Sequence, residues 1–467
     1  MEKNKIKTIA FITLGCKVNQ YETNAMAQKL IKKGFEIVEH NQKADIYIIN
    51  TCTVTNMSDR KSRQMIRRAK DINPKAKIIA VGCYVQVSRK EIENIEEIDL
   101  VLGNEEKVDI VKYCEEIIKN EKEAQVKTLE EVLPEKTTDL KDVMHTKEFA
   151  EFGEITYTEK TRAVIKVQDG CDRFCSYCII PYARGRVRSR KPENVIDEIT
   201  EIAKKGIKEV VITGIHIASY GKDFKKKYEL IDLLEEINKI EGIQRIRLGS
   251  IEPLLITEEF VQRLSKLEKI CEHFHLSLQS GCDETLKRMN RRYTTQQFKE
   301  ITKRLRNTYP DVNLTTDIIV GFPGETEDEF EKTYKFLKEI KFYKMHIFKY
   351  SPRKGTKAAE MKEQVPPEIK EERSKKLIEL SDKNEKEYNQ EYVGKEVEVL
   401  WEDEKNGIYK GHTKNYVQVE MLKQDLEDSK EKIKNIENTI DTVKVEKAEE
   451  HRIIVKNTDC NKNVTNM

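Results

Sequence analysis

Apolar runs alternate with stretches of helical spacing along the first 118 residues. Three of the apolar runs end in a cysteine: KTIAFITLGC, ADIYIINTC and AKIIAVGC. Such short runs predict buried strands, and NQYETNAMAQKLIKKG and NMSDRKSRQMIRRAKDINP between them predict helices. Strands that alternate with helices pair in parallel. The pattern therefore predicts a doubly wound parallel α/β domain over residues 1–118.

A second alternating series begins at residue 161 and extends to residue 384. Its apolar runs are separated by helical stretches such as PENVIDEITEIAKKG. The candidate strands are residues 163–168, 209–215, 245–250, 275–280, 314–322 and 345–351. Six strand–helix units predict a partial (β/α)6 barrel, smaller than the eight-fold one, although periodicity alone leaves an open sheet possible.

Two further segments lack this alternation of strand and helix. Residues 119–160 are polar and charged with weak periodicity, which is typical of a linker. Residues 385–457 hold short runs such as KEVEVLWE and GIYKGHTKNYVQVEML, interrupted by the charged stretch KQDLEDSKEKIKNIEN. They predict a small antiparallel β-barrel with one long loop or helical insertion. A polar tail, residues 458–467, follows.

The net charge of the chain excludes some classes of protein. The 467 residues include 85 Lys and Arg against 83 Asp and Glu, a net charge of +2. This balance excludes a uniformly basic nucleic-acid coat protein, so any contact with nucleic acid must come from local patches. Candidate patches are the basic runs 59–70, 183–191 and 287–292. Basic and aromatic residues also interleave near the C-terminus in a way that suits RNA: Tyr409, Lys410, His412, Lys414 and Tyr416.

Membrane and secretion signals are not evident in the sequence. No window approaches the ~18 consecutive apolar residues of a membrane span, and the first residues do not form a signal-peptide pattern. We therefore expect a cytoplasmic protein with no membrane partner. In that reducing compartment the ten cysteines are expected to bind metal or to act in catalysis rather than to form disulfides.

The strongest chemical signal is the motif GCDRFCSYC, which spaces Cys171, Cys175 and Cys178 as CxxxCxxC. Thiolates suit zinc or iron–sulfur centres. A structural zinc site needs four ligands, whereas three thiolates on a four-iron cluster leave one iron open. The loop also follows the first strand of the predicted barrel, at the end where such folds place chemistry. We expect a 4Fe-4S cluster; the alternative is a zinc knuckle completed by a distant Cys or His.

A second set of cysteines, Cys16, Cys52 and Cys83, ends three predicted parallel strands. Ligands of open α/β sheets bind beyond the carboxyl ends of the strands. Three parallel strands would bring these thiols to one edge as another three-ligand site. The alternative is that they are small buried core residues. The remaining cysteines are expected not to be ligands: Cys114, Cys271, Cys282 and Cys460.

The GCDRFCSYC loop resembles that of the radical S-adenosylmethionine (SAM) enzymes, in which the open iron chelates SAM. The resemblance implies that Tyr177 lies beside the SAM adenine. The Gly-Gly-Glu stretch that is usual in this superfamily is replaced by TGIHIASYG at 213–221. Polar residues at carboxyl ends of barrel strands are often functional, and among them we expect Glu252 and Gln279 to bind the cofactor.

Over residues 8–118, 161–360 and 385–456 the chain resembles the methylthiotransferases. These proteins join a cysteine-rich N-terminal domain, a radical SAM core and a TRAM RNA-binding domain. The resemblance implies that Cys16, Cys52 and Cys83 hold a second 4Fe-4S cluster, which carries the sulfur. The motifs TLGCKVNQYE, DGCDRFCSYCIIPYARGRVRSR, TGIHIASYG and HLSLQSGCDETLKRMNRRYT resemble the MtaB-type branch.

This resemblance implies a tRNA-modifying enzyme that methylthiolates carbon-2 of N6-threonylcarbamoyladenosine at position 37. Its cofactors would be two 4Fe-4S clusters and SAM, and its partners tRNA and a reducing electron donor. Two rivals keep the chemistry but change the substrate to isopentenyladenosine tRNA or to an aspartate of a ribosomal protein. A rival of another class is an iron–sulfur RNA-binding or redox-sensing protein without turnover.

Overall fold

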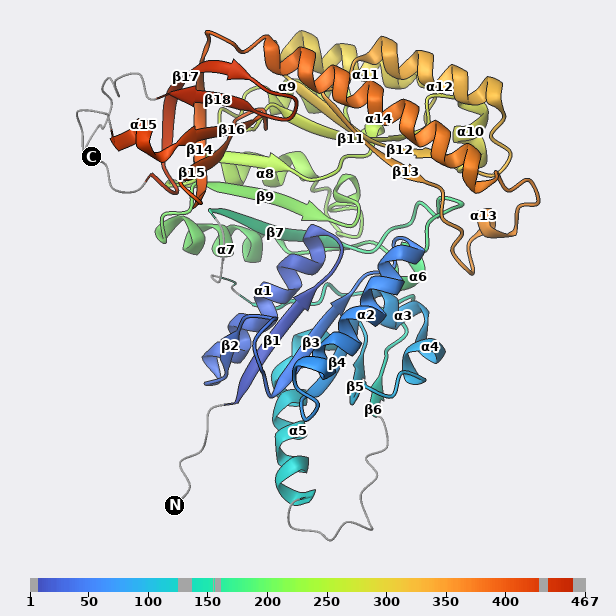
Figure 1. Ribbon diagram of the computed structural model, residues 1–467, viewed down its shortest axis with the longest axis vertical. Coiled ribbons are helices and arrows are strands. Elements are labelled where there is room, and N and C mark those ends of the chain that lie inside the picture. The colour runs from blue at the N-terminus through green and yellow to red at the C-terminus, as the bar shows by residue number, and fades with distance from the viewer. Residues whose placement is uncertain (1–6, 125–136, 154, 156–160, 428–435, 457–467) are drawn as a thin grey trace.

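The computed structural model describes residues 7–124, 137–153, 155, 161–427 and 436–456. Three parts succeed one another along the chain (Figure 1). We call them the N-terminal domain (residues 7–155), the barrel core (161–390) and the C-terminal barrel (396–456). Within the described residues, no helix is both long enough and apolar enough to cross a bilayer.

A six-stranded parallel sheet with the order β2-β1-β3-β4-β5-β6 forms the N-terminal domain. Its strands are β1 (Thr8–Thr13), β2 (Glu36–Val38), β3 (Ile46–Thr51), β4 (Lys77–Gly82), β5 (Leu100–Leu102) and β6 (Thr137–Asp139). One face packs on α1 (Lys17–Lys32) and α5 (Ile110–Ala124), and the other packs on α2 (Asn56–Ile72), α3 (Cys83–Val87) and α4 (Arg89–Glu93). Every residue of β3 is buried, as expected for a parallel strand covered on both faces. The doubly wound fold is confirmed.

The segment expected to be a linker, residues 119–160, belongs partly to this domain. Helix α5 continues to Ala124, and β6 pairs in parallel with β5 as the sixth strand. Phe152 and Ile155 are buried in the core of the domain. The linker expectation is therefore wrong for these parts. The sequence of β6, TTD, does not alternate apolar and polar residues, so its hydrophobic pattern does not predict a strand. This edge strand is held by backbone pairing with β5.

Six parallel strands build the barrel core: β7 (Arg162–Asp169), β9 (Glu209–Gly214), β10 (Arg245–Leu248), β11 (His273–Gln279), β12 (Asn313–Val320) and β13 (Lys344–Lys349). Isolated bridges from Ile246 to Ile270 and from Ile251 to Leu276 join the β10 side to β11. Among the described residues β7 and β13 do not pair with each other, so the barrel is partial, as predicted. The two-residue β8 (Arg188–Ser189) adds an antiparallel edge to β7.

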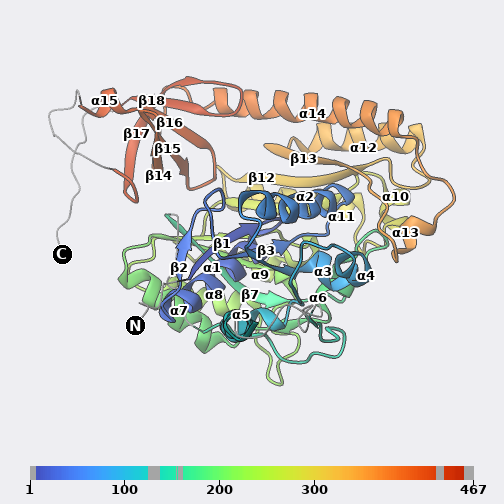
Figure 2. The same ribbon diagram turned by 60° about the horizontal axis from the view of Figure 1, so that its bottom comes forward.

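Helices cover the outer side of these strands (Figures 1 and 2). They are α7 (Pro192–Lys204), α8 (Leu230–Asn238), α9 (Glu258–Leu264), α10 (Asp283–Arg288), α11 (Thr295–Thr308), α12 (Glu327–Ile340) and α14 (Pro367–Gln390). Thr326 caps α12 in a capping box with Glu329, and Glu327 and Asp328 add charge that favours the positive helix start. The short α6 (Ile180–Arg184) follows the GCDRFCSYC loop.

The C-terminal barrel is closed, with the order β14-β15-β16-β18-β17. Its strands are β14 (Glu396–Lys405), β15 (Ile408–Thr413), β16 (Gln418–Leu422), β17 (Ile440–Ala448) and β18 (Ile453–Lys456). The small β-barrel is confirmed, although β16 and β18 pair in parallel rather than antiparallel, and the barrel starts later than residue 385, which lies inside α14. The charged insertion begins as α15 (Lys423–Glu427), and its residues 428–435 lie outside the described residues, as does the tail 458–467.

Candidate active site

The loop after β7 gathers Cys171, Cys175 and Cys178, which we call the loop thiols. A Cβ on Gly170, which has a φ of 71°, would lie 1.8 Å from the carbonyl oxygen of Arg186, so this turn needs glycine. Burial raises the pKa of Cys171 to about 11 and that of Cys178 to about 12, and Cys175 adds to both shifts. The three sulfurs thus lie close enough to interact.

Arg291 connects the loop thiols to a carboxylate. Its Nη1 donates to Cys175 Sγ at 3.3 Å, and its Nη2 lies 3.2 Å from Glu252 Oε2. His216 Nε2 lies 3.5 Å from the same oxygen. Burial alone would raise the pKa of Glu252, but the hydrogen bond to His216 and the charge of Arg291 hold it below its usual value. An ionised carboxylate therefore stands beside the thiols, ready to accept a hydrogen bond from a cationic ligand.

Tyr177 and Gln279, the other two residues expected to bind the cofactor, occupy different surroundings. The Tyr177 ring packs edge-on against Phe322, with 6.4 Å between ring centroids. Gln279 ends β11 with a φ of 72° in a buried position, and its side chain makes no hydrogen bond among the described residues. A buried amide normally has a partner, so Gln279 is available to a ligand. The cofactor contacts of both residues stay predictions.

The second set of cysteines also comes together, at the carboxyl edge of the N-terminal sheet; we call them the sheet-edge thiols. A Cβ on Gly15 would lie 2.7 Å from Cys52 Sγ, so the turn between β1 and α1 passes directly over that thiol. Burial raises the pKa of Cys52 to about 11, with further contributions from the Cys83 and Cys16 thiols. Cys16 is exposed, whereas Cys52 and Cys83 are buried.

In each set at least two of the three sulfurs lie more than 4.8 Å apart, which is wider than a single zinc ion requires. Tetrahedral Zn–S bonds of about 2.3 Å would place the sulfurs roughly 3.8 Å apart. Among the described residues, the only group of three His, Cys, Asp or Glu ligand atoms within 4.8 Å of one another is Asp382, Glu385 and His451. Three thiols at wider spacing suit a larger polynuclear centre with one ligand position left open.

A buried charge network joins the sheet-edge thiol Cys83 to Asp169, which precedes the GCDRFCSYC loop, and Arg184 of α6 is its centre. Its Nε donates to Cys83 Sγ at 3.2 Å and its Nη2 donates to Asn19 Oδ1 at 2.7 Å. The same guanidinium contacts Glu22 of α1 and Asp169 of β7. Although burial alone would raise the pKa of Glu22, Arg184 and two neighbouring lysines hold it well below its usual value. Nothing in the sequence motifs indicated this link.

Known proteins resemble this chain in both the N-terminal domain and the barrel core. The family model of the Radical SAM superfamily matches residues 165–337, and that of the Uncharacterized protein family UPF0004 matches residues 8–103. The chain is 43% identical over 88% of its length to Threonylcarbamoyladenosine tRNA methylthiotransferase MtaB of Bacillus subtilis, covering 90% of that protein. It is 42% identical to the MtaB protein of Aquifex aeolicus, over 88% of this chain and 96% of the relative. The chain belongs to the MtaB-type radical SAM methylthiotransferases.

More distant relatives of this methylthiotransferase carry other names. The tRNA-2-methylthio-N(6)-dimethylallyladenosine synthase of Caldicellulosiruptor saccharolyticus is 35% identical, over 88% of this chain and 86% of its own. The structure of the radical SAM methyltransferase TsrM from Kitasatospora setae matches with a TM-score of 0.52 at 15% identity, over 74% of this chain and 77% of that one. That likeness shows the fold alone.

Within this methylthiotransferase, the basic run 183–191 is not an open phosphate-binding surface. Arg184, Arg188 and Arg190 are each no more than 1% exposed. Arg188 lies 2.7 Å from Glu105, and Arg190 lies 2.6 Å from Glu151. The run therefore bonds the barrel core to the N-terminal domain, because acidic partners distant in sequence surround it. The RNA-contact expectation for these three arginines is wrong.

The aromatic–basic stretch of the C-terminal barrel differs from expectation in the same way. Tyr409 is 1% exposed and packs inside the barrel. Tyr416 stacks between His273 and His412, with Arg247 4.5 Å from its ring centroid. Both rings are occupied by protein, so neither is free to stack on a base as the sequence suggested. The stretch docks the C-terminal barrel onto the amino ends of the barrel-core strands.

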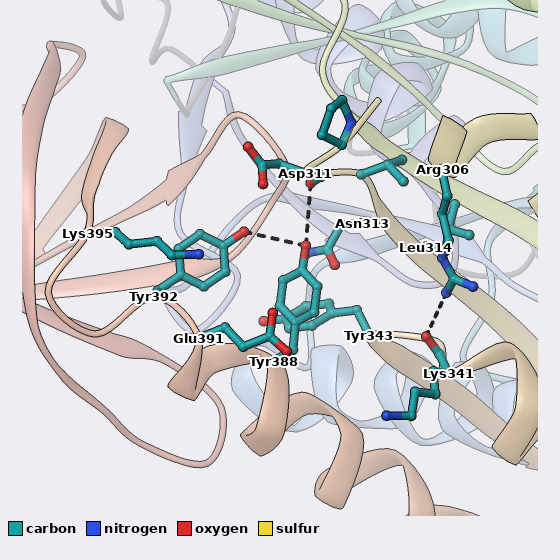
Figure 3. A pocket seen from close by; sticks show the side chains of 12 residues that line it. Arg306, Asp311, Asn313, Leu314, Lys341, Tyr343, Tyr388, Glu391, Tyr392 and Lys395 are labelled. Atoms are coloured by element: carbon teal, nitrogen blue, oxygen red, sulfur yellow. Dashed lines mark hydrogen bonds between the residues drawn. The ribbon is translucent and has the colours of Figure 1, made fainter. Parts of the chain in front are cut away.

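Two pockets lie outside the thiol sets. One, of about 210 Å³, lies where α11, β12 and α14 meet the C-terminal barrel (Figure 3). Tyr388 Oη donates there to the Asp311 carbonyl at 3.4 Å. The other, of about 540 Å³, is lined by Arg173 of the GCDRFCSYC loop and by further basic and aromatic residues. Its lysines are exposed: Lys222, Lys226 and Lys227.

The other cysteines stand apart from both sets. Cys114 is buried in the hydrophobic core of the N-terminal domain, Cys271 is buried near Arg247 and Glu209, and the Cys282 sulfhydryl donates to Glu284 at 2.9 Å. Cys460 lies outside the described residues. Sequence reasoning missed Arg184, Arg291 and His216 as site residues. Arg184 lies six residues after Cys178, the last cysteine of the loop, and this spacing alone does not mark it as a site residue.

Proposed function

We propose that this methylthiotransferase inserts a methylthio group at carbon-2 of N6-threonylcarbamoyladenosine at position 37 of tRNA. The observation that carries the proposal is the similarity over nearly the whole chain to relatives named for threonylcarbamoyladenosine, which exceeds the similarity to the relative named for dimethylallyladenosine. Two separate three-thiol sets support it, because the reaction needs a radical source and a sulfur source.

Two 4Fe-4S clusters and SAM supply the radical and the sulfur of this chemistry. The loop thiols would hold one cluster, and the sheet-edge thiols would hold the other. Glu252, kept ionised by Arg291 and His216, would accept a hydrogen bond from the SAM amino group. Tyr177 and Gln279 would contact the rest of SAM. Their described surroundings fit these roles, which are proposals.

Arg184 fixes the two thiol sets relative to each other. It is fully buried and bonds Cys83 on one side and Asp169, just before the GCDRFCSYC loop, on the other. A buried arginine with several acceptors is held in one geometry, because each lost partner would leave a charge unpaired. We propose that this bond keeps the radical source and the sulfur source at a constant separation and excludes water between them.

The tRNA would approach along the pocket that Arg173 lines. Lys222, Lys226 and Lys227 offer charge for the phosphate backbone, and Phe224 and Tyr228 offer apolar surface in the same pocket. We further propose a reducing electron donor as a partner and the cytoplasm, where tRNA is processed, as the location.

The proposal is tested with anaerobically reconstituted protein, SAM, a reductant and tRNA that carries threonylcarbamoyladenosine or isopentenyladenosine. The expected result is release of 5′-deoxyadenosine and methylthiolation of the first tRNA in preference to the second. Preference for isopentenyladenosine, or for a ribosomal-protein peptide supplied in parallel, would overturn the substrate. Failure to release 5′-deoxyadenosine would favour a non-catalytic iron–sulfur protein.

A further inference from the structure

Lys17 is a cation without a partner beside a sheet-edge thiol. It follows Cys16 in sequence and begins α1. Its side chain is exposed, and its Nζ makes no hydrogen bond or ion pair among the described residues. The cations that touch the thiols differ, because Arg184 is held by Glu22 and Arg291 is held by Glu252. The charge of Lys17 is therefore left for a ligand.

The charges around Lys17 come from the barrel core. Helix α1 packs against β7 and β9, and the groups that act on Lys17 are Tyr416 of the C-terminal barrel, Arg162 of β7, Arg247 of β10 and Glu209 of β9. Arg247 Nε lies 2.7 Å from Glu209, and Arg162 lies 3.1 Å from Glu402. Both arginines are thus paired with protein carboxylates, whereas in the described part of the chain no carboxylate lies at ion-pair distance from Lys17, which has only the weaker influence of Tyr416 and Glu209. An anion from outside the protein would be attracted to Lys17 in this region.

The proposed substrate brings such an anion. A threonylcarbamoyl group on N6 ends in a carboxylate, whereas a dimethylallyl group is a neutral hydrocarbon. Carbon-2 of the same adenine must come close to the sheet-edge thiols to receive sulfur. The N6 group of that base then lies within the same part of the site, next to the residue that follows Cys16.

We propose that the Lys17 ammonium binds the threonyl carboxylate of the substrate nucleoside and so selects it over nucleosides with a neutral N6 group. This inference rests on the proposed function. A lysine offers three donors on a flexible stem, and a hydrogen bond to a charged group contributes more than one between neutral groups. Lys17 is therefore a specificity-determining residue rather than a ligand of either cluster.

The test compares the affinities of reconstituted wild-type protein and Lys17→Gln for anticodon stem-loops. One stem-loop carries threonylcarbamoyladenosine, and the other carries its carboxamide, which has the same shape without the charge. Wild-type protein should bind the carboxylate at least tenfold more tightly than the carboxamide. Lys17→Gln should bind both alike, with the affinity of wild-type protein for the carboxamide. Lys17→Arg should restore most of the preference.

Lys33→Gln is the matched control, because Lys33 is an exposed lysine at the other end of the same helix; it should keep the wild-type preference. A Lys17→Gln protein that still prefers the carboxylate overturns the inference. If that variant loses iron, the wild-type comparison of the two stem-loops decides, and equal affinities overturn the inference. Failure of wild-type protein to methylthiolate threonylcarbamoyladenosine at all would instead refute the proposed function.

Discussion

Replacing Arg184 by methionine should destabilise the junction between the N-terminal domain and the barrel core. The guanidinium is buried and contacts Cys83, Asn19, Glu22 and Asp169. Methionine fills much of the same volume but offers none of these donors. The substitution therefore removes the charge without opening a large cavity, so the loss reports on the electrostatic network.

The magnitude follows from what remains after the substitution. Breaking a buried ion pair from one side costs about 3–5 kcal/mol. Glu22 would keep Lys107 at 2.5 Å and Lys166 at 2.7 Å, and Asp169 would keep Lys166 at 2.5 Å. These remaining partners place the loss at the lower end, about 3 kcal/mol. A free energy of unfolding close to that of wild-type protein would mean that Arg184 adds nothing to the stabilisation that Lys107 and Lys166 already provide.

The assay is urea-induced unfolding of the apoprotein, followed by circular dichroism, with the loss read from the shift of the midpoint at constant slope. Arg186→Met is the matched control, because Arg186 is about half exposed and lies 3.3 Å from an exposed Asp172. This variant should lose less than about 1 kcal/mol. The reasoning is refuted if the free energies of unfolding of the two variants agree within that amount.

Three further predictions concern the clusters and the buried carboxylates. Changing Cys171, Cys175 and Cys178 together to Ala should lower the iron content of reconstituted protein from about eight to about four per chain; loss of all the iron, or of none, would contradict two independent sites. Cys52→Ala should still release 5′-deoxyadenosine but should not methylthiolate tRNA, and a folded variant that fails to cleave SAM would show that the roles of the two sets are misassigned. The pKa of Asp169 is held at about 2, and that of Glu22 is also lowered. The stability that these carboxylates contribute should therefore be complete above about pH 5 and decline as the pH falls toward 2. If the urea midpoint of wild-type protein declines no more than that of Arg184→Met over this interval, the network does not stabilise the fold.

The placement of the cysteines was within reach of the sequence. Apolar runs ending in Cys16, Cys52 and Cys83 already implied one edge of a parallel sheet, because the carboxyl ends of parallel strands meet there. The structure brings these residues together, and it brings the CxxxCxxC loop to the end of β7. Their role as cluster ligands stays a prediction, since position alone does not bind iron.

The network around Arg184 was beyond reach of the sequence, because a run of arginines looks the same whether its partners are phosphates or buried carboxylates. Glu105 and Glu151, which pair with Arg188 and Arg190, lie far away in the sequence, although Arg190 also pairs with the nearby Glu198. The short strand β6 was missed because its three polar residues pair through the backbone. Tyr409 could have been placed correctly, since the period of two along β15 puts it on the opposite face from Lys410.

The central claim, that the chain methylthiolates threonylcarbamoyladenosine in tRNA, is tested most directly by mass spectrometry of tRNA nucleosides. Total tRNA from a strain that lacks this protein is compared with tRNA from the same strain carrying the gene on a plasmid. The account predicts that the 2-methylthio derivative of threonylcarbamoyladenosine disappears in the first and returns in the second, while unmethylthiolated threonylcarbamoyladenosine accumulates in the first. Loss of the 2-methylthio derivative of isopentenyladenosine instead, or an unchanged set of nucleosides, would contradict it.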